Sequence, residues 1–128
     1  MKITTMKTTV FIKKYEGKTL ADDGAYVSKE FNNFQNAMKR EVKRMAEEIG
    51  AVLVSFNKGH YDMSWFVERN GKYVYGNYSV IGNRTHVNLL DNVCYARIAA
   101  HSKDYIGGHN NRCSFAEMQE TMDRLLRA

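Results

Sequence analysis

The chain has 128 residues, of which 44% are apolar and 26% are charged, a composition typical of a folded domain rather than a disordered segment. Nineteen basic residues against fourteen acidic ones give a net charge of +5, which favours an anionic partner. No apolar stretch approaches the roughly 18 residues that span a bilayer, and lysines interrupt the first 14 residues. Two cysteines are too few for a disulfide framework. We therefore expect a cytoplasmic protein with no membrane partner.

Nothing along the chain marks an internal boundary, because it contains no proline, no Gly/Ser linker and no repeat. We expect a single domain over 1–128, with residues 1–15 as an N-terminal strand or arm. The Thr, Val, Ile and Phe content of this segment predicts a strand centred on Val10, Phe11 and Ile12. A loop is expected over 16–24.

Apolar residues spaced three or four apart predict an amphipathic helix that begins after Ser28 as N-cap and ends at Gly50. Its buried stripe is expected to contain Phe31, Phe34, Met38, Val42, Met45 and Ile49. The run 51–56 is nearly all apolar and rich in β-branched residues, which predicts a central strand.

Residues 61–69 and 72–81 alternate in polarity around Asn70-Gly71, a dipeptide typical of a type I′ hairpin turn. A two-residue turn fixes the register, so Arg69 pairs with Lys72 and Trp65 lies opposite Gly76. One face, expected to meet the core, carries Tyr61, Met63, Trp65, Val67, Val74, Gly76, Tyr78 and Val80.

The segment 92–100 suits either a strand or a helix, and we favour a strand. Ser114 and Glu117 form the capping-box pattern S-x-x-E. It precedes a final amphipathic helix with Phe115, Met118, Met122, Leu125 and Leu126 as its buried stripe. Together these elements predict an α+β fold, with an antiparallel sheet of three to five strands and two amphipathic helices on one face.

Four cations, Lys39, Arg40, Lys43 and Arg44, lie within two turns of the first predicted helix, away from its apolar stripe. Because like charges at this spacing repel one another, the cluster favours contact with something anionic, such as a nucleic-acid backbone. The alternative is a solvated face that nearby glutamates partly neutralise.

Two further groups could bind a partner. Phe66, Tyr73 and Tyr75 share the outer face of the hairpin, where aromatic side chains could stack on bases or anchor a protein. Alternatively, the N-terminal strand or the final helix covers them. Arg112 and the glycines 107–108 precede a helix N-terminus, which could hold an anion, although a simple connecting loop explains them as well.

No C-x-x-C or H-x-x-x-H pattern is present, so we expect no metal and no cofactor. Nucleophilic pairs of Cys113 with His109 or of Cys94 with His101 have no supporting motif. We expect a protein without enzymatic activity. The alternative is a small nuclease that uses His60, which flanks a turn with Asp62, or His109.

The order helix, three strands, helix over 28–128 resembles the double-stranded-RNA-binding domain. That family has a lysine-rich helix N-terminus after its third strand, whereas here the last helix opens with Ser114-Phe115-Ala116-Glu117. The resemblance therefore implies architecture only, and the RNA contacts of the family are not carried over.

Three segments, 59–66, 70–75 and 105–110, are similar to small orphan proteins of Gram-positive mobile genetic elements, some of which are anti-CRISPR proteins. This resemblance implies a non-enzymatic inhibitor in the cytoplasm of the host bacterial cell. Its partner would be a CRISPR-type nuclease or the complex of that nuclease with guide RNA. The alternative is a stand-alone module that binds RNA or DNA directly. The oligomeric state stays open.

Overall fold

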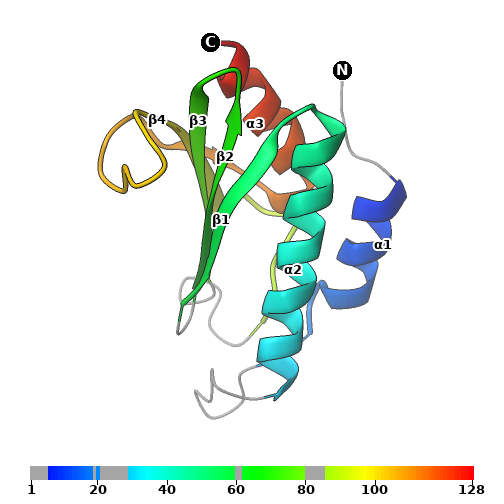
Figure 1. The fold of residues 1–128 in the computed structure, drawn as a ribbon. Coiled ribbons are helices and arrows are strands. Elements are labelled where there is room, and N and C mark those ends of the chain that lie inside the picture. Colours follow the sequence, from blue (N-terminus) through cyan, green and yellow to red (C-terminus); the bar gives the residue numbers. More distant parts are fainter. Residues whose placement is uncertain (1–5, 19, 21–28, 60–61, 80–85) are drawn as a thin grey trace.

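The computed structural model describes residues 6–18, 20, 29–59, 62–79 and 86–128. Within these ranges, three α-helices lie on one face of a five-stranded antiparallel sheet (Figure 1). The predicted α+β class is confirmed. The helices are α1 (Met6–Tyr15), α2 (Lys29–Glu48) and α3 (Met118–Arg127), the last preceded by the 3₁₀ turn η3 (Phe115–Glu117). The strands are β1 (Val52–Lys58), β2 (Asp62–Arg69), β3 (Lys72–Ser79), β4 (Cys94–Ala99) and β5 (Asn111–Cys113).

The N-terminal strand that we predicted is wrong, because residues 6–15 form helix α1. Its buried residues Thr8, Phe11, Ile12 and Tyr15 recur at the spacing of one helical face. Phe11 stacks on Phe34 of α2 at a ring distance of 6.1 Å. The helix therefore forms because its apolar spacing fits a core between helices, and this outweighs the β-branched composition.

Helix α2 follows the prediction closely. Five residues of the expected stripe are buried, and Gly50 has a φ of +74°, as a glycine that ends a helix should. Ser28, the predicted N-cap, lies outside the described residues. Among the helices that the structure describes, none is long and apolar enough to cross a membrane.

The hairpin of β2 and β3 has the predicted turn and register. Asn70 and Gly71 have φ values of +54° and +80°, as a type I′ turn requires. Arg69 pairs with Lys72, and Trp65 pairs with Gly76. The predicted pair of Tyr61 and Val80 lies outside the described residues.

Strand β1 is an edge strand, so its predicted central position is wrong. Each strand pairs with the next one along the chain, which leaves β1 with one neighbour. Its register with β2 shifts between Leu53 and Ser55, and Val52 and Val54 are exposed. Only one of its faces meets the core, where Phe56 stacks on Trp65 at 5.8 Å.

The segment 92–100 forms strand β4, as we favoured. The sequence did not predict β5, which spans three residues between a loop and the capping box. Ser114 and Glu117 form that box as predicted, and the box encloses η3, which leads directly into α3. Cys94 and Cys113 are direct neighbours across β4 and β5.

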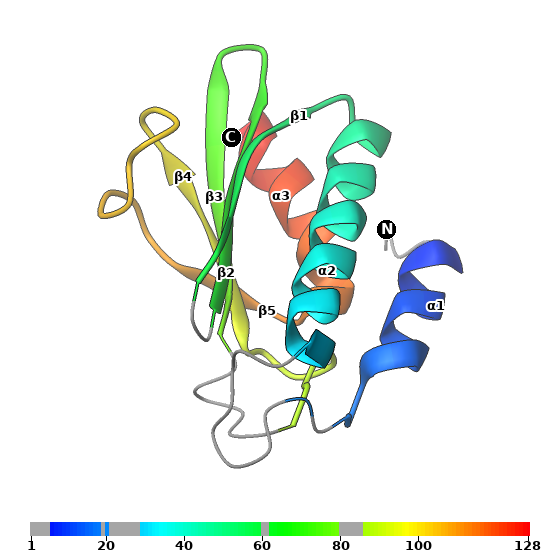
Figure 2. The ribbon, with the colours of Figure 1, turned by 60° about the horizontal axis from the view of Figure 1, so that its bottom comes forward.

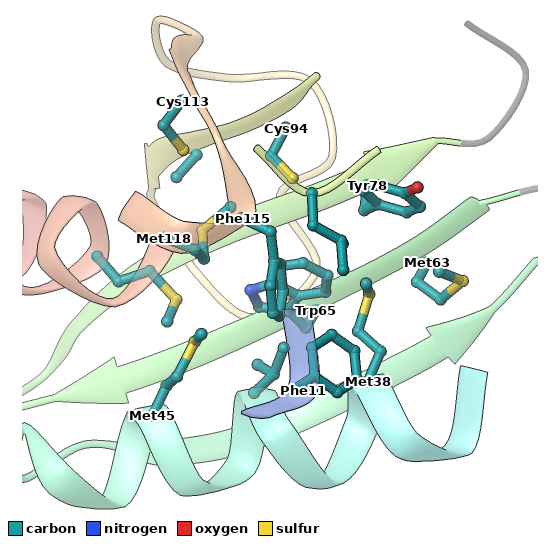
Figure 3. Close-up of a cluster of buried hydrophobic side chains, with 14 of the residues drawn as sticks. Phe11, Met38, Met45, Met63, Trp65, Tyr78, Cys94, Cys113, Phe115 and Met118 are labelled. Carbon is teal, nitrogen blue, oxygen red and sulfur yellow. The ribbon is translucent and has the colours of Figure 1, made fainter. Parts of the chain in front are cut away.

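The core fills the space between the sheet and the helices, and methionines account for much of it (Figure 3). Trp65 lies near its centre, with Phe11 and Phe115 close by (Figure 3). Unbranched methionine side chains adapt to the irregular space where helices cross a twisted sheet. The fully buried methionines are Met38, Met45, Met63, Met118 and Met122.

Candidate anion-binding surface

The predicted basic cluster on α2 divides into two parts in the structure. Lys39, Arg40 and Lys43 are exposed, and no ion pair joins them to an acidic residue within the described ranges. Arg44 is instead half-buried and forms ion pairs with Glu41 and Glu48. Three of the four predicted cations therefore remain available for a partner.

Arg44 belongs to a polar network that fastens α1 to α2. Thr8 of α1 donates its hydroxyl to Glu41 Oε2 at 2.6 Å, and Arg44 donates from Nη2 to Thr8 Oγ1 at 2.6 Å. Burial by itself lowers the pKa of Arg44, but hydrogen bonds to Glu41 and Glu48 outweigh it and raise the pKa. We conclude that Arg44 stabilises the fold.

A groove runs between α1 and α2, which lie side by side (Figures 1 and 2). Its larger part is a cavity of about 410 Å³, and a second cavity of about 280 Å³ adjoins it. The two cavities form one groove, because they share the lining residues Lys14, Tyr15 and Arg40. The other residues that line the larger cavity are Lys18, Leu20, Glu30, Asn33 and Asn36.

The groove extends the basic surface from α2 to α1, and Lys58 extends it toward the edge of the sheet. Lys58 Nζ donates to Asn36 Oδ1 at 2.9 Å, so this ammonium lies beside the exposed face of α2. The sequence did not single out Lys14, Lys18 or Lys58, because Lys14 was expected in an N-terminal strand or arm, Lys18 in a loop and Lys58 beyond the predicted strand 51–56. Once α1 is read as a helix, Lys14 falls in its last turn.

The outer face of the sheet is covered by the loop 100–110, not by the N-terminal segment or the final helix as we considered. Tyr105 from this loop lies against Phe66 and Tyr75 at ring distances of 5.1 and 5.7 Å. Phe66 and Tyr75 are buried, and Tyr73 is half-buried. Phe66 and Tyr75 are therefore not free to stack on bases, and Tyr73 packs against their cluster.

Arg97 holds this loop in place. Its guanidinium lies 4.6 Å from the centre of the Tyr75 ring and donates to Asn110 Oδ1 at 3.1 Å and to the Tyr105 carbonyl. At the turn of the loop, the Asp104 carboxylate accepts backbone N–H groups from Ala100 and Gly107, both at 2.8 Å. The loop is therefore tied down at both ends.

The anion site considered at the start of the final helix is not assembled. The N–H of Ser114 donates to Glu117 Oε1 at 3.1 Å, so a carboxylate of the chain itself already occupies this helix start. The N–H of Gly107 is bonded to Asp104. The Arg112 guanidinium is exposed and lies 5.8 Å from the Tyr95 ring.

The two cysteines are free and buried. Burial raises the pKa of Cys94, as does the nearby Cys113, and burial also raises the pKa of Cys113. Both effects oppose the thiolate that a nucleophile needs. His101 and His109 are exposed, and His60 lies outside the described residues. Within the described ranges, no group of three or more His, Cys, Asp and Glu side chains could hold a metal ion.

No family model, curated protein or solved structure matches this chain. The resemblances to the double-stranded-RNA-binding domain and to proteins of mobile genetic elements stay predictions.

Proposed function

We propose that the protein is a non-enzymatic binding protein whose basic surface, built from α1, α2 and the end of β1, contacts the phosphate backbone of a nucleic acid. The observation that carries this proposal is that Lys39, Arg40 and Lys43 are exposed and have no ion-pair partner among the described residues, while the fold itself uses Arg44. Neighbouring cations repel one another, and phosphates relieve that repulsion.

The basic surface draws on three elements that are far apart in the sequence. It consists of Lys14, Lys18, Lys39, Arg40, Lys43 and Lys58, all of them exposed. The exposed carboxylates on the same helices are Glu30, Glu47 and the Arg44-bound Glu48. If roughly three to six of these cations contact phosphates, the affinity for duplex should fall with salt with a log–log slope on the order of −3 to −5.

Contact with the backbone fits this surface better than recognition of bases. Phe66 and Tyr75 would have to leave the cover of Tyr105 before they could stack on a base. Lysine and arginine on a helix face instead attract phosphates whatever the sequence. We therefore expect binding that depends little on base sequence and strongly on salt.

A second candidate is an inhibitor of a CRISPR-type nuclease–guide RNA complex in the host bacterial cytoplasm, of the kind implied by the resemblance to proteins of mobile elements. The loop 100–110 favours it, because Ile106 is 94% exposed on a backbone fixed by Asp104 and Arg97. A rigid loop with an exposed apolar tip is suited to anchor in a pocket of a protein partner. The basic surface would then contact the guide RNA of the complex.

The proposal is tested by fluorescence anisotropy with labelled single- and double-stranded RNA and DNA at about 50 mM salt, where phosphate contacts are strongest. The variant Lys39→Gln/Arg40→Gln/Lys43→Gln should weaken binding and flatten the salt slope. The matched control Lys72→Gln/Lys103→Gln/Arg124→Gln removes the same charge elsewhere on the protein. It should change the affinity and the salt slope much less.

Two outcomes would overturn the proposal. One is no binding to any of the four probes, and the other is an equal loss of affinity in the two triple variants. In either case, an interference assay with type II CRISPR nucleases tests the second candidate. There, Ile106→Asp should relieve inhibition if the loop is the anchor, and undiminished cleavage in the presence of the unchanged protein would reject the inhibitor.

The non-enzymatic part of the proposal has its own test. Guide RNA and plasmid DNA incubated with the purified protein, with and without Mg²⁺, should stay intact. Multiple-turnover cleavage that disappears in a folded His60→Ala or His109→Ala variant would contradict the proposal, since general acid–base catalysis would then use one of these histidines.

A further inference from the structure

We infer that the groove between α1 and α2 is a specific site for a phosphate monoester, supplied either by the 5′ end of a nucleic-acid strand or by a free mononucleotide. This deepens the proposed function, on which it rests for nucleic acid as one source of the phosphate. The exposed Lys39 and Lys43 of α2 would contact backbone phosphates. The groove would hold the phosphate at the 5′ end of the strand.

The groove has the size and wall arrangement of a ligand site. Its larger cavity of about 410 Å³ falls within the roughly 300–1,000 Å³ of small-molecule pockets. Lys14 and Lys18 come from α1 and the turn after it, whereas Arg40 comes from the facing helix α2. Cations from both walls therefore line one space.

The walls that carry these cations are fixed by the fold. Tyr15 packs on Phe34 at 5.0 Å and on Phe11 at 5.1 Å, which anchors the last turn of α1. The N–H of Gly17 donates to the carbonyl of Val87 at 2.8 Å, and the N–H of Val87 donates to the carbonyl of Lys18 at 2.9 Å. A preorganised backbone reduces the entropy cost of binding.

The charge of the larger cavity matches a monoester. Among the described residues that line it, Lys14, Lys18 and Arg40 face a single carboxylate, Glu30, so these lining side chains carry a formal charge of +2. A phosphate monoester carries about −1.5 to −2 at neutral pH, whereas a backbone diester carries one negative charge. Arginine can also bind phosphate oxygens through two parallel hydrogen bonds.

Few described cations line the groove. Lys14 and Arg40 line both cavities, and Lys18 lines only the larger one. Arg44 also lines the smaller cavity, but it is ion-paired with Glu41 and Glu48. A cluster of three cations without ion pairs among the described residues fits one phosphate group better than a run of successive backbone phosphates.

The experiment compares 12-nucleotide RNAs that differ only in a 5′-phosphate or a 5′-hydroxyl, with affinities measured by anisotropy. We expect the phosphorylated RNA to bind on the order of tenfold tighter, as one extra charge-assisted contact allows. Arg40→Gln and Lys14→Gln should abolish this preference. The neighbouring Lys39→Gln, outside the groove, should weaken both RNAs alike and keep the preference.

Competition by AMP, with adenosine and inorganic phosphate as controls, distinguishes the two sources of the monoester. A 5′ preference that AMP competes away only weakly assigns the site to strand ends, and strong competition by AMP assigns it to mononucleotides. Equal binding of both RNAs with no competition by AMP would overturn the inference and leave the proposed function standing. Binding of AMP without binding of either RNA would overturn the proposed function and leave the groove as a mononucleotide site.

Discussion

The indole of Trp65 lies against the backbone of Gly76 on the neighbouring strand, so closely that a Cβ added to Gly76 would be 2.2 Å from Trp65 Nε1. Phe56 stacks on the same indole, with an angle of 3° between the rings. The indole nitrogen is buried and has no hydrogen-bond partner among the described residues. Shape rather than hydrogen bonding therefore places the largest side chain of the core.

Gly76→Ala should accordingly destabilise the protein, because the added methyl group forces the indole out of its site. We expect a loss of about 1–3 kcal/mol in the free energy of unfolding, as for other overpacked cores. Urea denaturation followed by far-UV circular dichroism measures it. In a Trp65→Leu background the same substitution should cost much less, and an equal cost in both backgrounds would show that the indole contact is not the cause.

Arg69 at the end of β2 should contribute to stability through its contacts with α3. Its Nη1 donates to Asp123 Oδ1 at 2.7 Å and to the Ile49 carbonyl at 2.8 Å, and both charged side chains are mostly buried. Arg69→Met should lower the free energy of unfolding by about 1–3 kcal/mol, less than for a fully buried pair.

The matched control is Arg127→Met, which removes the other cation beside the same carboxylate. Arg127 Nη1 lies 3.5 Å from Asp123 Oδ2, and its side chain is 65% exposed. Arg127→Met should therefore lower the free energy of unfolding by less than about 0.5 kcal/mol. Urea denaturation measures both variants. An equal decrease in the free energy of unfolding would contradict a stabilising role of the contacts between Arg69 and α3.

Local signals account for the parts of the fold that the sequence predicted correctly. Asn70-Gly71 determines the hairpin turn within two residues, and alternation then determines the register. The segment 6–15 carried two conflicting signals, β-branched composition and helical spacing. Only its packing against Phe34 and Phe115 decides between them, and those contacts are distant in sequence.

The candidate site could be predicted from the sequence only in part. The exposed cations of α2 follow from helical periodicity alone, which places Lys39 and Lys43 away from the core. The groove depends on where α1 docks, so Lys14 and Lys18 could not be assigned to it from the sequence. The burial of Phe66 likewise depends on a loop some 40 residues further along the chain, whose Tyr105 reaches back over the sheet.

Cys94 and Cys113 should be inert in the native protein. Both are buried, and burial raises the pKa of each thiol, which lowers the fraction of reactive thiolate. Labelling with a disulfide reagent at pH 8 should be on the order of a hundredfold slower in buffer than in urea, because it requires local opening. Rapid labelling of either cysteine in buffer, with the circular dichroism spectrum unchanged, would contradict the burial.

The loop 100–110 should loosen in acid before the rest of the protein unfolds, because Asp104 organises it. Hydrogen bonds from the N–H groups of Ala100, Gly107 and Ile106 favour the charged carboxylate and lower the pKa of Asp104. A carboxyl group whose pKa is lower in the folded state stabilises that state fully above its unfolded pKa, about 3.9 for aspartate. This contribution is lost as the pH falls through the lowered folded value.

A pH titration of the amide resonances of Ala100 and Gly107 by NMR measures this directly. Their chemical shifts should change with a common midpoint below about 3.9, the value for an unperturbed aspartate. In Asp104→Asn this step should vanish, and amide exchange at Gly107 should be faster at neutral pH, because the remaining amide oxygen is a weaker acceptor than a carboxylate. A midpoint at or above the ordinary value would mean that the carboxylate does not hold the loop. The fixed position of Ile106 at its tip, on which the protein-anchoring candidate depends, would then lose its physical basis.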